Sequence, residues 1–494
     1  MIIGPPKVTT KPRPVALFVP GFQSLKVVTE HGIESARGAK RSYDLLTRYD
    51  DHVAYVSGSL RTMLTTVGSS HFTADVWRGH ATSLSLDGTP MKILSLRRTL
   101  SHLEPDVAYD ELTRVVEFLT DQGVRAGSVS SMAWQLWRST LDFTFEAAFD
   151  SRVSRQAFYG GRQEATPSRG FSPYEDYLNV DLSSAYPHSM AERPYAGELR
   201  RVSPTTTLDP TVPGLAQVRA HVPEGLPFNP LPYRLAEDLI QWPSGDVEGV
   251  WTWGELCAAR DLGCTVSVER CWAPVRLVQP FARWWRLMID ARRELGSGPE
   301  RLVKALTNTL WGCFAMTGDD RCQVRWSDDY ANDPVVVSST PRAMAQAATV
   351  HIAAETTSRV RVRLLREGLY AGAGTPVHVD TDGIIIRTDD LGSRPLGDAP
   401  GEWRVKRTMP LIEVKAPQCY RFTESGSPQW HYVVSGVEPS RAPSVFMDHP
   451  GFNVSFNGFD GVAPPGPILE GESLMRYRLV KSSLETQIYG RPLA

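Results

Sequence analysis

The stretch from Val377 to Ile386, Val-His-Val-Asp-Thr-Asp-Gly-Ile-Ile-Ile, limits the possible folds of this chain more than any other. A β-rich run enters it, Asp-Thr-Asp-Gly makes a turn, and three isoleucines leave it, a pattern that predicts a tight β-hairpin. Buried strands on both sides would hold Asp380 and Asp382 at the tip, where two carboxylates need a cation to stay charged. Taken alone, the pattern also fits an ordinary Asp-Gly turn without a chemical role.

Two segments upstream favour the chemical interpretation. Residues 177–187, Tyr-Leu-Asn-Val-Asp-Leu-Ser-Ser-Ala-Tyr-Pro, predict an apolar strand that delivers Asp181 into a polar turn. Residues 304–312 predict a helix with Lys304 and Asn308 one turn apart on one face. Taken in chain order, residues 177–187, 304–312 and 377–386 resemble motifs A, B and C of family B DNA polymerases. These motifs read D-x-x-S-L-Y-P, K-x-x-x-N-S-x-Y-G and Y-x-D-T-D-S. Each motif alone is a weak signal, but the three together are specific.

Composition sets broad limits on the class of protein. Hydrophobic residues make up 41% and charged residues 22% of the 494 residues, as in an ordinary soluble globular protein of about two to four domains. The formal net charge is -2, so basic residues that bind nucleic acid must gather locally. The six cysteines show neither a secreted-type framework nor C-x-x-C spacing, and we expect reduced thiols.

The sequence shows no sign of a membrane or secretory protein. The first residues lack the apolar core of a signal peptide, and no apolar run is long enough to cross a bilayer. We therefore expect a cytoplasmic protein, located in the host cytoplasm if it is viral or plasmid-borne.

The resemblance implies a multidomain fold of α/β and α+β type. The implied fold is that of a right-hand polymerase with palm, fingers and thumb, preceded by a degenerate RNase H-like exonuclease domain. Within the family, the resemblance is closest to the protein-primed branch. The expected domains are an exonuclease-like region at 1–150, a first palm part at 151–280 with an insertion at about 210–275, a fingers hairpin at 281–316, a second palm part at 317–440 and a thumb-like region at 441–494.

The exonuclease-like region keeps the pattern of an α/β layer but lacks nuclease motifs. Residues 15–19 and 53–56 predict strands, and residues 106 to about 122 predict a helix. No D-x-E stands where the family's first exonuclease motif is expected, and Ser57–Ser59 stands where the second has asparagine and aspartate. Tyr109–Glu111 resembles the third only faintly. We expect the exonuclease fold without its chemistry.

The resemblance also assigns roles in nucleotidyl transfer. That reaction uses two divalent cations, here Mg²⁺ with Mn²⁺ as a substitute, held by oxygen ligands. Asp181 and Asp380 are the implied metal ligands with the carbonyl of Leu182, and Asp382 supports them. Lys304 would stabilise charge on the β- and γ-phosphates. The other residues implied at the nucleotide site are Ser183, Ser184, Ala185, Tyr186, Arg292, Asn308, Trp311, Gly312 and Thr381.

Two further segments are implied to bind DNA. Tyr159-Gly160-Gly161-Arg162 lies just before motif A, where the family carries its Y-x-G-G template-strand motif. Lys415 and Tyr420 lie on a strand that resembles the family's primer-binding K-x-Y segment, with Gln418 at the position of the lysine.

Four residues depart from the family's motifs without removing a metal ligand. Ala185 replaces leucine, Trp311 and His378 each replace tyrosine, and Gly383 replaces serine, which we expect to loosen the motif C turn. Tyr186, which is kept, would stack beneath the sugar and exclude a 2′-hydroxyl.

The sequence thus predicts a monomeric DNA-directed DNA polymerase without proofreading. Its partners would be primer–template DNA, deoxynucleoside triphosphates and, in the protein-primed case, a terminal protein or other replication proteins. Two alternatives stay open at this point, a primase-like or self-priming polymerase and a non-catalytic DNA-binding replication scaffold.

Overall fold

The structure is a computed structural model that describes most of residues 2–448. The residues outside the description are 1, 4–13, 22, 58–59, 69–71, 78–79, 87–88, 90, 97–99, 101–102, 147–150, 166–172, 237–238, 297–298, 317–320, 326–334, 339–348, 372–373, 393–395, 435–436, 438–441 and 449–494. The chain forms two compact units. We call Ile2–Phe145 with Phe281–Ala348 the N-terminal unit, and Glu146–Pro280 with the residues from Thr349 onward the C-terminal unit.

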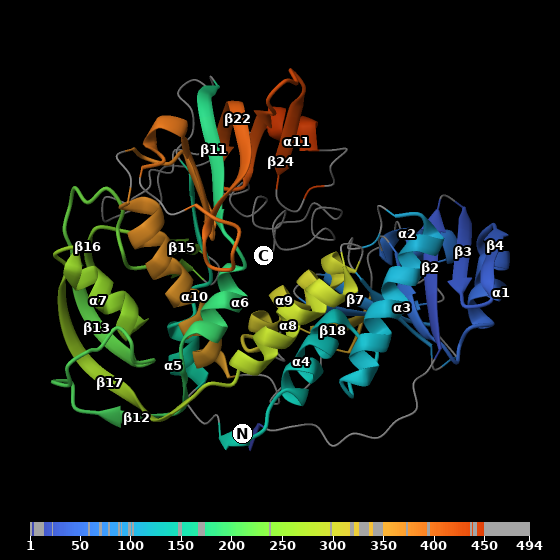
Figure 1. Cartoon of the computed structure of the whole chain (residues 1–494), viewed down its shortest axis with the longest axis horizontal. Helices are drawn as coiled ribbons and strands as arrows, with labels where there is room; N and C mark the ends of the chain where they lie inside the picture. Colours follow the sequence, from blue (N-terminus) through green and yellow to red (C-terminus); the bar gives the residue numbers. More distant parts are fainter. Residues whose placement is uncertain are drawn as a thin grey trace. The chain divides into compact units, whose positions relative to one another are not determined.

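A nine-stranded mixed sheet forms the centre of the N-terminal unit, in the order β19-β18-β6-β7-β8-β5-β2-β3-β4 (Figure 1). Strands β2, β5 and β8 are parallel, and the other pairs are antiparallel. The strands are β2 (Val15–Gly21), β3 (Ser24–Thr29), β4 (Gly32–Arg37), β5 (Val53–Val56), β6 (Phe72–Trp77), β7 (His80–Leu86), β8 (Lys92–Ser95), β18 (Arg321–Arg325) and β19 (Val335–Ser338). Helices α1 (Ala39–Thr47), α2 (Leu60–Val67) and α3 (Pro105–Asp121) pack beside it.

The predicted strands at 15–19 and 53–56 and the predicted helix from 106 are therefore confirmed. The buried core of the sheet includes Phe18 of β2 and Val56 of β5, together with Leu45 and Leu46 of α1 and Phe72 of β6. Helix α3 begins with Pro105 in its first turn and ends before Gly123, whose φ of 71° suits a glycine after a helix.

The fingers segment is a helical hairpin, as the sequence predicts. Helix α8 (Ala282–Leu295) and helix α9 (Glu300–Cys313) contact each other, and α9 packs against α4 (Val129–Ser139) within the same unit. Four aromatic rings join the hairpin to α4, with centroids 4.8–5.5 Å apart; they are Trp134, Trp137, Phe281 and Phe314.

A seven-stranded antiparallel sheet forms the centre of the C-terminal unit, in the order β10-β20-β21-β11-β22-β23-β24 (Figure 1). Its strands are β10 (Arg162–Ala165), β11 (Tyr174–Leu182), β20 (His378–Thr381), β21 (Gly383–Arg387), β22 (Trp403–Ala416), β23 (Cys419–Thr423) and β24 (Trp430–Val434). Strands far apart in the sequence thus lie side by side, and motifs A and C occupy neighbouring positions at the centre of the sheet.

The predicted insertion forms a second sheet with its own core. Its order is β12-β17-β13-β16. The elements are β12 (Tyr195–Val202), β13 (Leu215–Val222), β16 (Gly245–Thr252), α7 (Trp253–Asp261) and β17 (Thr265–Val278), with a small hairpin of β14 (Tyr233–Ala236) and β15 (Leu239–Gln241). Thr252 and Glu255 form a capping box at the start of α7. The segment from β16 to β17 therefore runs strand, helix, strand.

Helix α10 (Val350–Arg363) packs against three helices of the C-terminal unit: α5 (Ser151–Gln156), α6 (Ala185–Glu192) and α7. It continues as a π-helical segment, Leu364–Leu369. Residues 341–348, which precede this helix in the sequence, lie outside the description.

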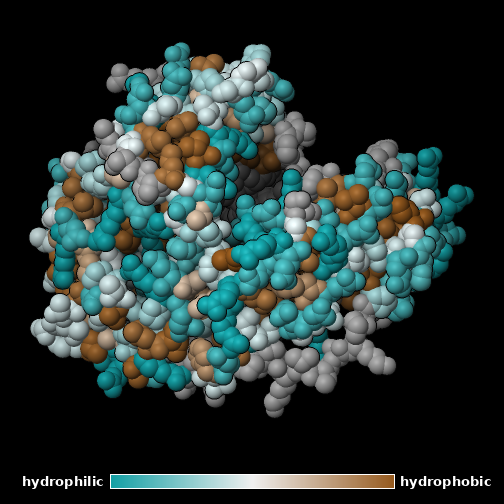
Figure 2. Space-filling model, viewed as in Figure 1, coloured by the Kyte–Doolittle hydropathy of each residue, from teal (hydrophilic) through white to brown (hydrophobic). Residues whose placement is uncertain are grey.

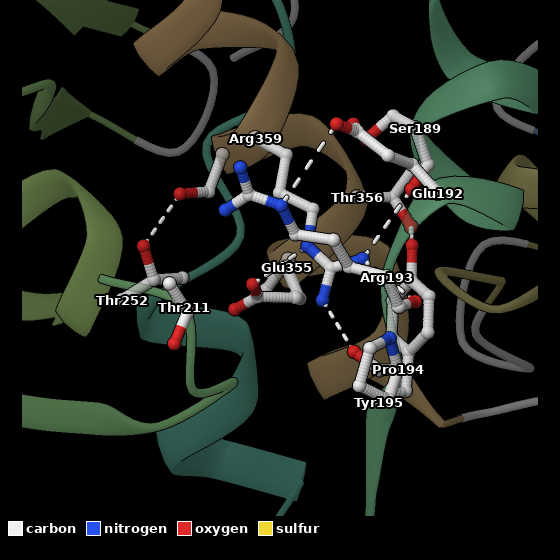
Figure 3. A network of polar contacts seen from close by, with 12 residues as sticks. Ser189, Glu192, Arg193, Pro194, Tyr195, Thr211, Thr252, Glu355, Thr356 and Arg359 are labelled. Carbon is white, nitrogen blue, oxygen red and sulfur yellow. Dashed lines mark hydrogen bonds and ion pairs between the residues drawn. The ribbon is translucent and has the colours of Figure 1, made fainter. Parts of the chain in front are cut away.

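One arginine of α10 binds the end of α6, the helix that follows motif A. The Arg359 guanidinium donates hydrogen bonds to the carbonyls of Ser189, Arg193 and Pro194 at 2.5–3.3 Å, and it pairs with Glu355 at 2.8 Å (Figure 3). Its guanidinium also lies 4.2 Å from the centre of the Tyr195 ring. A cation here satisfies the carbonyls that a helix leaves unpaired at its C-terminus.

The remaining expectations concern composition and the two ends. Cys257, Cys264, Cys271, Cys313 and Cys419 are thiols, and Cys264 and Cys271 belong to the core of the insertion, so their spacing reflects packing.

Within the described residues no helix has the length and apolarity to cross a membrane. Hydrophobic and hydrophilic patches are interspersed on the face drawn in Figure 2. Of the thumb-like region, the structure describes only α11 (Ala442–Asp448), and the predicted C-terminal helix lies outside the description.

Candidate active site

Strand pairing brings the three predicted carboxylates to one end of neighbouring strands. In the hairpin β20–β21 Asp380 is paired with Gly383, and Gly383 is paired in turn with Asp181 of β11. The Leu182 amide donates to the Asp382 carbonyl at 2.9 Å, and the Asp382 amide donates to the Asp380 carbonyl at 2.7 Å. The predicted motif C hairpin is confirmed, and the motif A strand lies directly beside it.

The tight turn depends on Thr381 rather than on the glycine. Thr381 has a φ of 65°, in the left-handed region that few non-glycine residues adopt. Gly383 lies inside β21, where an added Cβ would stand 3.0 Å from the Val180 carbonyl oxygen and 3.3 Å from the Asp181 Cβ. Glycine at this position allows close contact between motifs A and C. The expected loosening of the turn stays a prediction.

Asp181 is held by two cations from β22. Arg404 Nη2 lies 3.3 Å from its Oδ1, and Lys406 Nζ lies 3.3 Å from its Oδ2. The Asp181 side chain is only 13% exposed, so two basic side chains lie against a largely buried carboxylate.

Asp380 is held by uncharged donors instead. Its Oδ1 accepts hydrogen bonds from Gln418 Nε2 at 2.7 Å, from Thr381 Oγ1 at 2.9 Å and from Gln163 Nε2 at 3.3 Å. Gln418, the residue at the position of the family's lysine, thus contacts the motif C carboxylate directly. Its backbone N–H donates to His378 Nε2 at 2.9 Å, so His378 is the acceptor in this contact.

Asp382 lies in a largely desolvated position. Burial, followed by the negative charges of Asp181 and Asp380, raises the pKa of Asp382 to about 6, and Lys406 partly opposes the shift. Such a perturbation indicates an excess of negative charge around a buried position, which is the electrostatic condition for binding a cation.

The motif A turn is fixed by the loop that precedes β22. Ser183 donates its amide to the Glu402 carbonyl at 2.8 Å, and its carbonyl accepts from the Gly401 amide at 2.6 Å. Ser184 has a φ of 51° and precedes the first residue of α6, Ala185. Tyr186 in that helix is buried, and burial together with the charges of Asp382 and Asp380 raises the pKa of its hydroxyl. The turn therefore places Tyr186 near the carboxylates.

The segment Tyr159-Gly160-Gly161-Arg162, here called the Y-G-G segment, has two side chains with a structural role. Tyr159 and Arg162 are buried, at 8% and 1% exposure. Tyr159 donates to the Val250 carbonyl at 3.2 Å, and Arg162 pairs with buried Glu164. The backbone of the segment lies against motif C, because Arg162 is paired with Thr381 and a Cβ added at Gly161 would lie 2.8 Å from Thr381 Cγ2. Both side chains are therefore inside the fold, and the DNA-binding role of this segment stays a prediction. Gly160 has a φ of 77°, a backbone conformation that favours glycine.

The Lys415 side chain also forms its contacts inside the fold. Its Nζ donates to the carbonyls of Phe446 at 2.8 Å and Met447 at 3.2 Å, and the residue is 6% exposed. We do not retain it as a DNA contact. Tyr420 is 9% exposed, with its ring 5.0 Å from that of His378, and burial raises its pKa to about 12.

The predicted fingers residues belong to the N-terminal unit. Lys304 and Asn308 lie on one exposed face of α9, as predicted, with Trp311 and Gly312 one turn further along. Arg292 pairs with Glu300 across the helical hairpin at 2.9 Å, so its guanidinium already has an acid partner there.

Sequence reasoning missed Arg404, Lys406 and Gln163. Arg404 and Lys406 both lie on β22, but the pairing of β11 with β22 shifts at Lys406, so the alternation of a regular strand does not predict that both side chains reach Asp181. What the sequence could not show was that this strand is paired with motif A. Gln163 follows the glycines of the Y-G-G segment and reaches Asp380 only because β10 pairs with β20.

Solved structures with a similar fold include phi29 DNA polymerase complexed with primer–template DNA and incoming nucleotide substrates. That chain gives a TM-score of 0.65 at 10% identity, covering 89% of the present chain and 95% of its own. The orthorhombic crystal form of phi29 DNA polymerase gives 0.61 at 11% identity, with coverages of 88% and 95%. The chain has the fold of a phi29-type DNA polymerase. No family model and no curated protein matches the sequence.

This likeness concerns the fold, and it confirms the predicted fold class. An exonuclease-type α/β domain precedes a right-hand polymerase, although the two sequences share only about one residue in ten. The roles of individual residues rest on the geometry described above.

Proposed function

We propose that this protein is a template-directed DNA polymerase that adds deoxynucleotides to a 3′-hydroxyl with two divalent cations and without proofreading. The observation that carries the proposal is the placement of Asp181, Asp380 and Asp382 at one end of neighbouring strands in a chain with a polymerase fold.

The donor set fits magnesium. Carboxylate oxygens from Asp181 and Asp380, with the Leu182 carbonyl, are the hard ligands that Mg²⁺ prefers. The raised pKa of Asp382 reflects its burial and the negative charges of Asp181 and Asp380, conditions that favour a bound cation. Among the described residues no group of three or more His, Cys, Asp and Glu side chains has the geometry of a formed metal site. Asp181, which now faces Arg404 and Lys406, would have to turn toward the ions.

The chain's own residues would orient the reactants. Bound Mg²⁺ would activate the primer hydroxyl and neutralise the leaving pyrophosphate. Asp380 would be held in position by Gln418 and Gln163, and Tyr186 would lie beneath the sugar of the incoming nucleotide. Lys304 and Asn308, exposed on α9, would contact the triphosphate. The primer hydroxyl can belong to DNA, RNA or a terminal protein, and the same carboxylates would serve each.

The absence of proofreading follows from the composition of the exonuclease-like sheet. Strands β2 and β5, at which the family's first two exonuclease motifs are expected, carry no Asp or Glu in Val15–Gly21 or Val53–Val56. Metal-dependent hydrolysis of DNA needs such carboxylates.

Primer extension with Mg²⁺ tests the proposal. Asp380→Asn should lower extension by on the order of a thousand-fold or more while the protein stays folded and still binds DNA. Asp389→Asn, an exposed aspartate just beyond β21, serves as the matched control. Extension by Asp380→Asn at the rate of the control would exclude the two-metal assignment, and a wild-type protein that binds DNA without extending it would favour the scaffold alternative.

A further inference from the structure

Arg404 and Lys406 are two cations to which the proposed reaction assigns no role. Each oxygen of Asp181 faces one of them at 3.3 Å. The Arg404 side chain is 40% exposed and the Lys406 side chain 51%, whereas Asp181 is 13% exposed. The carboxylate is therefore inside the site, and its two counterions reach from solvent into it.

An irregularity of β22 directs Lys406 toward the site. The pairing of β11 with β22 shifts between Asn179 and Val180: Arg407 faces Asn179, and Val405 faces Val180. Lys406 is consequently the extra residue of a β-bulge. Bulges interrupt the ladder and redirect a side chain, and they are common next to active sites.

The charges of the site require these cations to move. Asp181, Asp380 and Asp382 bring up to three negative charges together, and Arg404 and Lys406 offset two of them. Divalent cations bound to Asp181 would repel both neighbours, and at separations of a few ångströms this repulsion is strong in a partly desolvated position. The two basic side chains would then be left beside the site without their present acceptor.

We propose that Arg404 and Lys406 are exchangeable counterions, which neutralise Asp181 in the metal-free protein and bind backbone phosphates of primer–template DNA once Asp181 turns to a metal ion. This rests on the polymerase function proposed above. Metal binding and DNA binding are then coupled, and the coupling must act in both directions.

The shape of this part of β22 favours a DNA strand over a free nucleotide. Residues 405–408 are exposed, and three of the four residues from Arg404 to Arg407 are basic, in a chain with a net charge of -2. Arg404 and Lys406, which lie together at Asp181, can each contact one phosphate of a DNA backbone, whereas Arg407 lies over the Phe422 ring.

The test measures DNA binding without nucleotide, so no chemistry occurs. Fluorescence anisotropy with labelled primer–template DNA compares the wild type with the double variant Arg404→Gln/Lys406→Gln, in EDTA and in Mg²⁺ at equal ionic strength. The wild type should bind more tightly in Mg²⁺. The variant should lose most of that gain, and its slope of log affinity against log salt should fall by about 2, close to 0.9 for each phosphate that the variant no longer neutralises.

A second measurement needs neither DNA nor activity. Calorimetric titration of Mg²⁺ into the free protein should show several-fold tighter binding by the double variant, because no cation competes for Asp181. Arg219→Gln is the matched control, since Arg219 is also a strand arginine in ion pairs, with Glu269 at 2.9 Å and Glu248 at 3.7 Å, but lies in the four-stranded sheet. It should change neither quantity.

The outcomes separate the two proposals. A wild type that neither binds nor extends primer–template DNA overturns the proposed function and this inference together. A wild type that extends primers, beside a double variant with unchanged salt slope and unchanged Mg²⁺ gain, overturns the inference alone. A variant altered only in its KM for nucleotide assigns the two cations to the triphosphate and also overturns it. If the double variant does not fold, Lys406→Gln alone should show a slope change of about 1.

Discussion

The three carboxylates of the site are each stabilised in a different way. Asp181 is balanced by the charges of Arg404 and Lys406, and Asp380 by the neutral amides of Gln418 and Gln163. Asp382 has only the distant help of Lys406, and burial raises its pKa to about 6. Asp382 is therefore the carboxylate whose removal should change the free energy of unfolding of the metal-free protein most clearly.

Replacing Asp382 with asparagine should stabilise the metal-free protein at neutral pH. The folded chain holds the Asp382 proton up to a pKa of about 6, whereas the unfolded chain releases it near 3.8. The stability that this proton contributes is full below about pH 4 and is lost as the pH rises through 6. The shift corresponds to roughly 1–3 kcal/mol. Urea unfolding in EDTA between pH 4 and 8 should give a flatter profile for Asp382→Asn than for the wild type.

The exposed Asp389 provides the comparison for this experiment. Asp389→Asn should leave the pH profile of the wild type intact, because the Asp389 side chain is 84% exposed. Identical profiles for Asp382→Asn and the wild type would contradict the proposed environment of Asp382.

Tyr186 should decide which sugar is accepted. Its ring is buried near Asp380 and Asp382, so a 2′-hydroxyl placed against it would overpack a rigid site. Overpacking typically costs about 1–3 kcal/mol, roughly ten- to a hundred-fold in rate. Tyr186→Val should raise ribonucleotide incorporation relative to deoxynucleotide incorporation, and Tyr186→Phe, which keeps the ring, should not. If both activities fell together in Tyr186→Val, the ring would only be a packing element.

At the scale of elements, β10 determines how firmly the motif C hairpin is held. Arg162 of β10 is paired with Thr381 and Gln163 with Asp380, and Gly161 lies against the Thr381 side chain. This strand therefore supports the one residue of the turn that has a left-handed backbone.

Gly161→Ala should push β10 away from the turn. The new Cβ would lie 2.8 Å from Thr381 Cγ2 and 3.1 Å from its Cα, and only a backbone shift can relieve the second contact. We expect a loss of about 1–3 kcal/mol in stability and a larger fractional loss of primer extension. Gly254→Ala, whose Cβ would meet its nearest neighbour at 3.7 Å, is the control and should be neutral in both assays. Equal behaviour of the two variants would show that β10 does not position the hairpin.

The elements were largely predictable because they depend on local pattern. Alternation and turn chemistry define the hairpin at Asp380, and the break at residues 296–299 defines the two fingers helices. Burial was less predictable. Tyr159, Arg162 and Lys415 have side chains that suit DNA, yet their partners are a carbonyl, a glutamate and the end of α11, all of them outside the motifs themselves. A motif predicts a position in the chain but not which neighbour a side chain reaches.

At the scale of the whole molecule, β2 and β5, the strands of the N-terminal unit near which exonuclease motifs are expected, carry no Asp or Glu. The purified protein should therefore not trim a mismatched 3′ end. A labelled primer–template with a 3′ mismatch, incubated with Mg²⁺ and no nucleotides, should keep its length, and with nucleotides it should be extended or stalled. Shortening that persists in Asp181→Asn would place a nuclease site in the N-terminal unit and contradict this prediction.

The pairing of β18 with β6 has a consequence for the order in which the protein can fold during its synthesis. The N-terminal unit takes its residues from both sides of a long intervening segment, 146–280. While that segment is being translated, β6 lacks its partner strand and the rings of Trp134 and Trp137 lack Phe281 and Phe314. A nascent chain shorter than about 325 residues therefore exposes a strand edge and an aromatic surface, the features that chaperones bind and that promote aggregation.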